Sequence, residues 1–358
     1  MEKARHGGNV SELSRKYGFK ISDILDFSAS LNDFITESDT ITAIKENLLG
    51  TYPGSDEPLR ANLAKYNRVP PEYILPGPGL SYFIYRISEI FRNKKALLIR
   101  PAFSEYSRAF STHDVVFSQY PVSHIANLLP EIREEKYSLV CINRPDTPIG
   151  DMLDRSSLLE LSEACIAGKA FLLIDEAFID FLPDGERRFS SELVSENKFV
   201  ILGRSLTKIF STPSLRAGYL INSGDILNRI RDLMEPWTLG NHIIEAFSNV
   251  DFRSVSKYSG LVGEERDFLI KSMHSLGFKV SGNPKANYVT FRTPSNLDVN
   301  ELSDFLQKNG ILIRTLEDFP EFGKDFIRIS VKRREKNEAL LSAIKKYMIN
   351  PGQNIREQ

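Results

Sequence analysis

Short apolar runs recur along the chain, and most of them end at a glycine, a proline or a polar residue. Runs of this length with such boundaries are typical of buried strands. We predict a strand of this kind at the start of 96–110, where it ends at Pro101, another at the start of 137–153, a third at 199–202, and a fully buried parallel strand at 171–174. Between the runs, apolar residues three or four positions apart predict amphipathic helices, as at Leu59, Leu63 and Tyr66. This pattern predicts buried strands, each followed by a turn or a helix.

The pattern changes from about residue 250. The later part alternates short strands with helices, which is typical of a small α+β domain packed on the first. The predicted helices are 262–276, 299–308 and a terminal helix, and the predicted strands are 279–280, 288–291, 311–314 and 326–331. Just before this part, Pro236 and Trp237 are predicted to open a helix, because proline is favoured at the first helical position.

A lysine stands between two apolar runs in the stretch 199–221, which reads FVILGRSLTKIFSTPSLRAGYLI. We expect the first strand to break at Gly203 and the second to lie at 219–221. A lysine held there can be partly desolvated, which lowers its pKa and lets the neutral amine form a Schiff base with an aldehyde. Ser205 and Arg216 could hold a phosphate. An aldehyde that carries a phosphate suggests pyridoxal 5'-phosphate (PLP); the alternative is a surface hairpin with a solvated Lys208.

Length and charge narrow the class of protein. A chain of 358 residues predicts two domains. The hydrophobic content is 41%, the charged content is 26%, and the net charge is -1. This composition is that of a globular protein with no general attraction to nucleic acid or to anionic membranes, so any anion site must be local.

The two cysteines, Cys141 and Cys165, form neither a disulfide framework nor a zinc motif. We expect Cys141 to be a buried small hydrophobic residue. No metal site is expected. The first residues lack the apolar centre of a signal peptide, and no apolar run reaches transmembrane length. We therefore expect a cytoplasmic protein.

The stretch around Lys208 resembles the lysine segment of fold-type I PLP enzymes, most closely that of the histidinol-phosphate aminotransferase and threonine-phosphate decarboxylase branch. Further matching motifs occur in the family's order: HGG at 6–8, LDFSAxxN at 25–32, YPG at 52–54, and DEAFIDF at 175–181. The resemblance covers almost the whole chain. It implies a large domain with a mostly parallel sheet (36–248), a small C-terminal domain (249–358) and an N-terminal arm (1–35).

The resemblance assigns cofactor-binding roles to several residues. Lys208 forms the Schiff base, and Asp175 keeps the pyridine nitrogen of PLP protonated so that the ring can draw off electrons. Phe103 stacks on the ring. The cofactor phosphate is held by main-chain N–H groups after a glycine-rich turn and by two side chains; these residues are Gly77, Gly79, Leu80, Ser81, Ser205 and Arg216. Tyr52 reaches the cofactor phosphate of the other subunit, which implies a homodimer.

One position departs from the family pattern. The family has Asn-Pro-x-Gly, whose asparagine bonds the ring hydroxyl of PLP, whereas this chain has Thr147-Pro148-Ile149-Gly150. Thr147 could donate that hydrogen bond, and Asn143 and Arg144 are alternatives. Asp146 would repel the ring oxygen unless it is protonated or turned away.

The resemblance also implies a substrate site. His6 and Asn32 of the N-terminal arm help to hold the substrate phosphate, and Arg314 and Arg328 bind its anionic groups. Strand arginines in apolar runs need an anionic partner. Besides a substrate, that partner could be Glu317, Asp318 or Asp325.

Phe178 and the Pro236-Trp237 pair favour the decarboxylases, since aminotransferases of the branch usually have tyrosine at the position of Phe178. The implied reaction is decarboxylation of phosphothreonine or phosphoserine to the amino-alcohol phosphate used in cobalamin biosynthesis. A histidinol-phosphate-type aminotransferase is the alternative enzyme. A PLP-fold protein that only binds, without catalysis, is the alternative from another class.

Overall fold

A computed structural model describes residues 6–35, 51–319 and 321–349 and divides them into two compact units. The large unit comprises residue 35 and the segments 51–147 and 152–259. The small unit comprises 6–34, 148–151 and the described residues from 260 onward. The division into an arm (1–35), a large domain (36–248) and a small domain (249–358) remains a prediction, since the structure groups residues 6–34 with the C-terminal segment.

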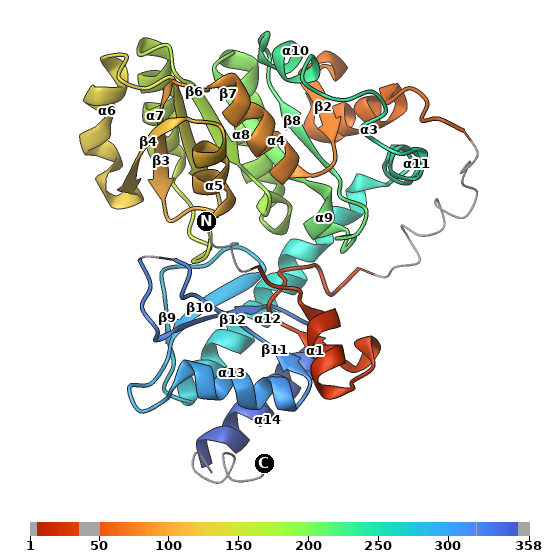
Figure 1. Ribbon diagram of the computed structural model, residues 1–358, viewed down its shortest axis with the longest axis vertical. Coiled ribbons are helices and arrows are strands. Elements are labelled where there is room, and N and C mark those ends of the chain that lie inside the picture. The colour runs from red at the N-terminus through yellow and green to blue at the C-terminus, as the bar shows by residue number, and fades with distance from the viewer. Residues whose placement is uncertain (1–5, 36–50, 320, 350–358) are drawn as a thin grey trace. The chain divides into compact units, whose positions relative to one another are not determined.

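A seven-stranded sheet forms the centre of the large unit (Figure 1). Strand β8 is antiparallel to both of its neighbours, and the other pairs are parallel. The mostly parallel sheet predicted from the sequence is therefore confirmed. In spatial order the strands are β2 (Ile74–Gly77), β8 (Gly218–Ile221), β7 (Val200–Ser205), β6 (Phe171–Asp175), β5 (Leu139–Asn143), β3 (Lys95–Arg100) and β4 (Val116–Pro121).

Helices pack against this sheet, because its central strands begin with apolar residues that would otherwise be exposed on both faces. One hydrophobic core joins the sheet to α4, α5 and α10 and includes Leu80, Phe83, Tyr106, Phe110 and Ile226. The α-helices of the large unit are α3 (Glu57–Asn67), α4 (Leu80–Ile90), α5 (Glu105–Thr112), α6 (Ile125–Arg133), α7 (Arg155–Ala167), α8 (Asp184–Glu196), α9 (Leu206–Ile209), α10 (Ile226–Arg231) and α11 (Asn241–Ser248). Its 3-10 helices are η2 (Pro71–Tyr73), η3 (Val122–His124), η4 (Ile179–Phe181) and η5 (Phe252–Val255).

The small unit contains a four-stranded antiparallel sheet in the order β12 (Arg314–Thr315), β13 (Phe326–Ser330), β10 (Tyr288–Arg292) and β9 (Lys279–Val280). Its helices are α12 (Ser256–Ser275), whose first turn is counted with the large unit, α13 (Val299–Lys308) and α14 (Arg334–Ile349) (Figure 1). Asp298 caps α13 by accepting hydrogen bonds from the backbone N–H groups of Asn300 and Glu301, which explains why this helix has the predicted bounds.

The N-terminal segment is tied to the small unit by strand pairing. It forms α1 (Val10–Tyr17), η1 (Ile21–Asp23) and β1 (Leu25–Asp26), and β1 pairs in parallel with β11 (Ile311–Leu312). Leu13, Ile24 and Leu312 form a small core beneath it. This pairing brings residues 25–26 next to residues 311–312, which are far apart in the sequence.

Three local predictions are wrong. Strand β7 does not break at Gly203 but continues to Ser205, because β8 pairs with it as far as Ser205 and Gly218. Pro236 and Trp237 do not open a helix: Trp237 has a φ of 57°, and α11 begins at Asn241. The single strand predicted at 311–314 is divided between β11 and β12, which belong to different sheets.

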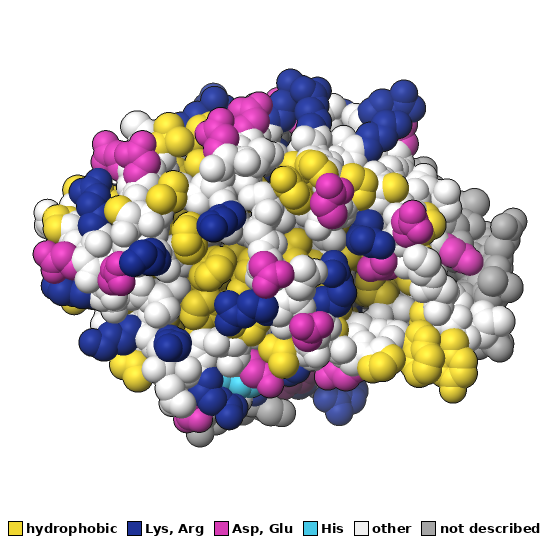
Figure 2. Space-filling model, turned by 90° about the horizontal axis from the view of Figure 1, so that it is seen from above, with side chains coloured by type: hydrophobic (Ala, Val, Ile, Leu, Met, Phe, Trp, Pro, Cys, Tyr) yellow, Lys and Arg dark blue, Asp and Glu magenta, His cyan; other side chains and the backbone are white. Residues whose placement is uncertain are grey.

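Figure 2 shows one face of the molecule on which basic and acidic side chains are interspersed. This mixture agrees with the net charge of -1. Among the described residues, no helix combines the length and the apolar character needed to cross a membrane.

Candidate active site

Three neighbouring parallel strands end side by side in the large unit. Asn143 on β5 lies beside Asp175 on β6, and Asp175 lies beside Gly203 on β7. Ligands of open α/β sheets bind outside the carboxyl ends of the strands. We therefore look for the cofactor site at this edge of the sheet.

Asp175 is buried, and both of its carboxylate oxygens accept hydrogen bonds. Oδ1 accepts from the backbone N–H of Ala177 at 3.0 Å, and Oδ2 accepts from the Tyr106 hydroxyl at 3.1 Å. Burial raises the pKa of Asp175 from 3.8 to about 6, although these bonds and one from Asn143 oppose the rise. A cation beside this carboxylate would stabilise its ionised form, as expected for a group that keeps a pyridine nitrogen protonated.

Lys208 lies on the single-turn helix α9, between β7 and β8, as predicted. Its Nζ is 5.8 Å from the centre of the Phe178 ring. The turn is fixed by its neighbours, since the backbone N–H groups of Leu206 and Thr207 both donate to the carbonyl oxygen of Ala217. The structure thus places the predicted lysine and Phe178 close together.

A cradle suited to an anion lies where β2 leads into α4. Gly79 has a φ of +88°, and a Cβ on it would lie 3.1 Å from a terminal nitrogen of Arg216, so the guanidinium lies directly against this glycine. Leu80 and Ser81 follow in the first turn of α4, whose N–H groups and dipole favour an anion. Ser205 precedes α9, and its hydroxyl makes no capping bond.

Close contact holds the two lysine-flanking strands against this cradle. A Cβ on Gly203 would lie 2.5 Å from the Leu80 side chain, and a Cβ on Gly218 would lie 3.0 Å from the backbone nitrogen of Leu80. Glycine at these two positions lets the start of α4 approach β7 and β8. The phosphate-binding residues predicted from separate parts of the sequence are therefore brought together in the large unit.

The residues proposed for the cofactor ring lie at the end of β5. The Asn143 Oδ1 atom accepts a hydrogen bond from the backbone N–H of Phe103 at 3.1 Å. Asp146 and Thr147 are both buried. Arg144 instead directs its guanidinium to Glu186 at 2.5 Å and to Glu176 at 3.6 Å. Asn143, Asp146 and Thr147 remain as neighbours for a ring hydroxyl.

The two predicted substrate arginines lie directly opposite each other on β12 and β13 of the small unit. Arg314 pairs with Asp318 at 2.6 Å, one of the three carboxylates considered from the sequence. Arg328 lies 5.0 Å from the centre of the Tyr288 ring, and its nearest polar contact is the Ser28 carbonyl at 3.4 Å. Burial and the neighbouring Arg314 lower the pKa of Arg328 to about 10, and the charge of Asp318 opposes this fall. The Arg328 Nε is buried without a hydrogen bond in the described part of the chain.

The predicted phosphate-binding residues His6 and Asn32 also belong to the small unit. Asn32 is buried, and its Oδ1 accepts from the backbone N–H of Phe34 at 3.1 Å. The Gly8 N–H donates to the Ser28 hydroxyl at 2.8 Å. A Cβ on Gly7 would lie 2.2 Å from the Ser28 carbonyl oxygen, so only glycine allows this segment to lie against Ser28. Arg328 and the His6 segment therefore share Ser28 as a neighbour.

Tyr52 is on the surface of the large unit with 75% of its area exposed. Its ring stacks on Trp237, which is 60% exposed, with 4.5 Å between the ring centres. Asn241 joins the two segments, because its Oδ1 accepts from the Gly54 N–H at 2.9 Å. The YPG and PW motifs thus form one exposed aromatic pair.

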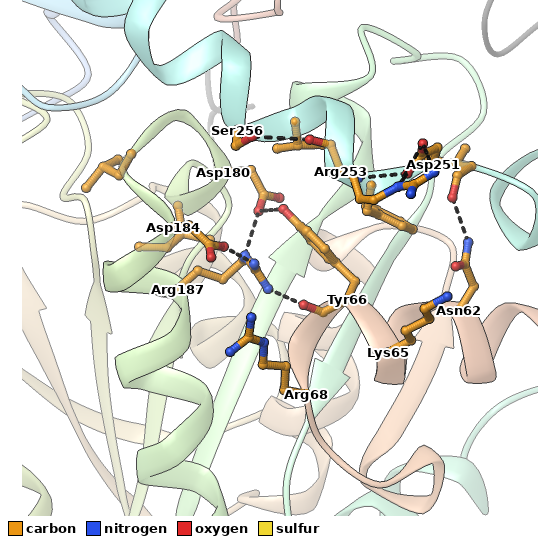
Figure 3. A pocket seen from close by; sticks show the side chains of 15 residues that line it. Asn62, Lys65, Tyr66, Arg68, Asp180, Asp184, Arg187, Asp251, Arg253 and Ser256 are labelled. Atoms are coloured by element: carbon orange, nitrogen blue, oxygen red, sulfur yellow. Dashed lines mark hydrogen bonds and ion pairs between the residues drawn. The ribbon is translucent and has the colours of Figure 1, made fainter.

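The large unit also has a pocket of about 700 Å³ that contains none of the predicted site residues (Figure 3). Two of its charged groups pair with each other and contact Tyr66: Arg187 lies 3.9 Å from Asp180 and 3.8 Å from the Tyr66 ring centre, and Asp180 accepts from the Tyr66 hydroxyl at 2.6 Å. Because neither Lys208 nor Asp175 lines this pocket, we place the cofactor at the strand ends instead. Within residues 6–35, 51–319 and 321–349, no group of three potential ligands could hold a metal ion.

Sequence reasoning missed two groups. Tyr106 is not among the residues that the sequence singles out, yet its hydroxyl donates a hydrogen bond to Asp175. Glu176 was seen only as a letter of the DEAFIDF motif, yet it is buried between Arg144 and Arg204. A buried carboxylate needs charged partners, so the placement of Glu176 directly after an apolar strand was the available signal.

The strand-end residues fit PLP. They combine a buried carboxylate whose pKa is raised, a lysine at the same edge, and a glycine-lined anion cradle against a guanidinium. Bound there, PLP would have its phosphate at Gly79, Arg216 and Ser205, its pyridine nitrogen at Asp175 and its aldehyde at Lys208.

Comparisons with known proteins agree with a PLP enzyme fold. The family model for aminotransferase class I and II matches residues 22–344. The chain is 27% identical to the threonine-phosphate decarboxylase of Salmonella typhimurium, over 96% of each protein. It is also 27% identical to a bifunctional adenosylcobalamin biosynthesis protein of Leptospira interrogans, covering 100% of this chain and 42% of that one.

Among solved structures, the histidinol-phosphate aminotransferase of Clostridium acetobutylicum superposes with a TM-score of 0.83 at 26% identity, covering 91% of this chain and 100% of the other. The fold, the strand-end residues and the family match lead to one conclusion. The chain belongs to the aminotransferase class I and II family, has the fold of type I PLP enzymes, and uses pyridoxal 5'-phosphate as its cofactor.

Proposed function

We propose that this chain is a PLP-dependent decarboxylase that acts on L-threonine O-3-phosphate or L-serine O-phosphate. The products are CO2 and the amino-alcohol phosphate, aminopropanol phosphate or ethanolamine phosphate, for cobalamin biosynthesis. The similarity to a threonine-phosphate decarboxylase over 96% of both chains supports this proposal. The observation that carries it is the Arg314–Arg328 pair, which faces across β12 and β13.

Two like charges directly opposite each other destabilise a strand pair unless anions compensate them. Asp318 pairs with Arg314 at 2.6 Å, whereas Arg328 forms no ion pair of its own among the described residues and is attracted to the same Asp318; it contacts the Ser28 carbonyl and the Tyr288 ring. A substrate that carries a phosphate and a carboxylate supplies the missing anion. We assign Arg328, with Arg314 beside it, to the anionic groups of the substrate, and His6 and Asn32 to its phosphate.

When bound, PLP accepts the electron pair left at Cα from whichever substrate bond stands perpendicular to its ring. The chain's residues decide which bond that is, by fixing the anionic groups of the substrate. Lys208 carries the amine that holds the cofactor and returns a proton to Cα. Asp175 stabilises the protonated ring nitrogen, and Phe103 packs against the ring face.

Phe178 supports decarboxylation over amino transfer. The Lys208 Nζ lies 5.8 Å from its ring centre, so this ring is a close neighbour of the predicted Schiff-base lysine. The family resemblance implies that aminotransferases of the branch usually have a tyrosine at this position, and this chain lacks its hydroxyl. The alternative function is a histidinol-phosphate-type aminotransferase, which the superposition with the Clostridium enzyme favours.

The exposed Tyr52–Trp237 pair supports a homodimer. Large aromatic side chains with more than half of their area exposed are typical of a surface that another chain covers. We propose that Tyr52 reaches the active site of the partner copy. A cytoplasmic location remains an expectation from the sequence.

The test measures CO2 release from phosphothreonine and from phosphoserine, in parallel with amino transfer from histidinol phosphate to 2-oxoglutarate. CO2 release without amino transfer is the expected result. Amino transfer without CO2 release would overturn the proposal in favour of the aminotransferase. The methyl group that separates the two phosphorylated substrates is worth about 1–3 kcal/mol in a pocket, so a preference of 10- to 200-fold is the expected range.

A catalytically inactive binding protein is distinguished by colour and turnover together. The purified protein is expected to show the visible absorbance of bound PLP, and a Lys208→Ala protein is expected to lose it. A wild-type protein that stays colourless after PLP is added would favour the binding protein.

A further inference from the structure

Charged residues at the ends of β5, β6 and β7 meet on the opposite side of the sheet from Tyr106. Successive side chains of a strand point to opposite faces. Asp175 bonds Tyr106 on α5, while the next residue, Glu176, bonds Ser190 on α8. Arg144 follows Asn143, and Arg204 precedes Ser205, so each of these charged residues is adjacent in sequence to a cofactor residue.

Glu176 is the centre of this charged group, and it has no exposed side-chain surface. Its Oε2 accepts two hydrogen bonds from Arg204, at 2.9 Å from Nε and at 2.6 Å from a terminal nitrogen. Its Oε1 lies 3.6 Å from a terminal nitrogen of Arg144 and accepts from the Ser190 hydroxyl. One carboxylate therefore connects the ends of three adjacent strands, β5, β6 and β7.

The two arginines extend the group into the helices. Arg204 donates to the Asn67 side chain on α3 and to the Arg187 carbonyl oxygen on α8 at 3.1 Å. Arg144 donates to the Leu153 carbonyl oxygen at 3.2 Å and to Glu186 at 2.5 Å. The strand ends are thus fixed to α3 and α8 through side chains that are fully bonded.

The backbone couples the same strands on the cofactor side. The Arg144 N–H donates to the Asp175 carbonyl oxygen at 2.8 Å, and the Glu176 N–H donates to the Gly203 carbonyl oxygen at 2.8 Å. A shift of the Glu176 side chain would therefore move the peptide groups that carry Asp175 and that lead into Ser205. A contribution to stability alone does not explain why Glu176, Arg144 and Arg204 are charged, because a buried ion pair can often be replaced by apolar residues without loss of stability.

We propose that Glu176 is a positioning residue for PLP: by bonding Arg144 and Arg204 together it holds Asp175, Asn143 and the start of the lysine turn in the geometry that binds the cofactor. The inference concerns the cofactor and not the substrate. It therefore stands whether the enzyme decarboxylates or transfers an amino group.

The test compares PLP binding by the wild type, Glu176→Gln and Arg144→Met, together with the pH dependence of the visible absorbance of the holoenzymes. Glutamine keeps the size of Glu176 and removes its charge, and methionine replaces the Arg144 stem while leaving the Glu176–Arg204 pair. Replacing groups that orient a binding residue typically costs about 10- to 100-fold in affinity at metal sites. We expect the dissociation constant of PLP to rise about tenfold or more in Glu176→Gln and by a smaller factor in Arg144→Met, with a shifted pH midpoint in both.

Glu265→Gln is the matched control. Glu265 pairs with Arg334 at 2.9 Å in the small unit, so the same substitution removes an ion pair from the other unit. This variant is expected to bind PLP like the wild type. The proposal is overturned if Glu176→Gln and Arg144→Met melt at lower temperature but keep the wild-type PLP affinity and pH midpoint. If Glu176→Gln does not fold, Arg144→Met decides by the same two readouts.

Discussion

The Tyr106 hydroxyl donates a 3.1 Å hydrogen bond to Oδ2 of Asp175, and both side chains are buried. The bond joins α5 to the end of β6 and lowers the pKa of the carboxyl against the effect of burial. A buried carboxylate that loses one of few donors becomes harder to ionise. Tyr106 therefore helps to keep Asp175 in the form that stabilises a protonated pyridine nitrogen.

Tyr106→Phe removes this donor with little change of shape. We expect the dissociation constant of PLP to rise about tenfold, since a hydrogen bond to a charged group is worth roughly 1.5–3 kcal/mol and part is recovered from neighbours. Equilibrium titration of the apoprotein with PLP measures this. Tyr82→Phe serves as the control, because Tyr82 bonds Glu235 at 2.9 Å on the surface. Equal affinities for Tyr106→Phe and the wild type would contradict the assigned role.

Asp175→Asn should change how the stability of the apoprotein depends on pH. Asp175 has a pKa of about 6 in the folded chain and an ordinary value of 3.8. Between these values the folded state holds a proton that the unfolded state releases, so stability falls as pH rises from about 4 to about 6, by up to about 3 kcal/mol. Asparagine cannot ionise, so the free energy of unfolding of Asp175→Asn does not fall over this pH range on account of residue 175.

Urea unfolding of the two apoproteins at pH 4 and pH 7 measures the difference. The free energy of unfolding of Asp175→Asn, relative to the wild type, is expected to be higher at pH 7 than at pH 4. A difference that is the same at both pH values would show that Asp175 is not a buried acid in the apoprotein. With PLP present, Asp175→Asn is expected to be less active than the wild type, because the variant lacks the carboxylate partner of the ring nitrogen.

The two substrate arginines should respond differently to removal. Arg328→Met deletes a cation whose Nε is buried without a hydrogen bond among the described residues, so we expect a fall in kcat/KM of about 100-fold with no loss of stability. Arg314→Met leaves Asp318 without its partner and should lower the free energy of unfolding by about 1–3 kcal/mol. Steady-state kinetics and urea unfolding of both variants test this. Adding Asp318→Asn to Arg314→Met is expected to restore the stability, and wild-type kcat/KM in Arg328→Met would exclude its role.

Gly7→Ala should displace the N-terminal segment. Its Cβ would lie 2.2 Å from the Ser28 carbonyl oxygen, a distance that requires the backbone to move. We expect KM for the phosphorylated substrate to rise about tenfold as His6 is displaced, while the free energy of unfolding changes by less than about 1 kcal/mol. Gly323→Ala is the control, because a Cβ there meets nothing within 4 Å. An unchanged KM in Gly7→Ala would remove His6 from the substrate site.

The local pattern of apolar and polar residues was enough to predict the strands that carry the proposed cofactor-binding residues. The apolar run at 171–174 and the acidic residue that follows it predict β6 and the place of Asp175. The flanking runs likewise predict that Lys208 lies between two strands. These features depend on neighbours in sequence, which hydrophobic periodicity reports directly.

Contacts between distant segments could not be predicted in this way. Tyr106 and Asp175 are 69 residues apart, and Ser28 and Arg328 are 300 apart. Even for Arg314, whose partner is four residues away, the sequence offered three carboxylates, and only the turn after β12 selects Asp318. The helix predicted at Pro236 failed because tertiary contacts hold Trp237 against Tyr52 in a turn.

The central claim is that the bond cut in the substrate joins Cα to its carboxylate. The most direct measurement uses L-threonine O-3-phosphate with deuterium at Cα and mass spectrometry of the product. We predict CO2 and an aminopropanol phosphate that keeps the deuterium. A keto product that has lost the deuterium, formed with transfer of the amino group, would contradict the account.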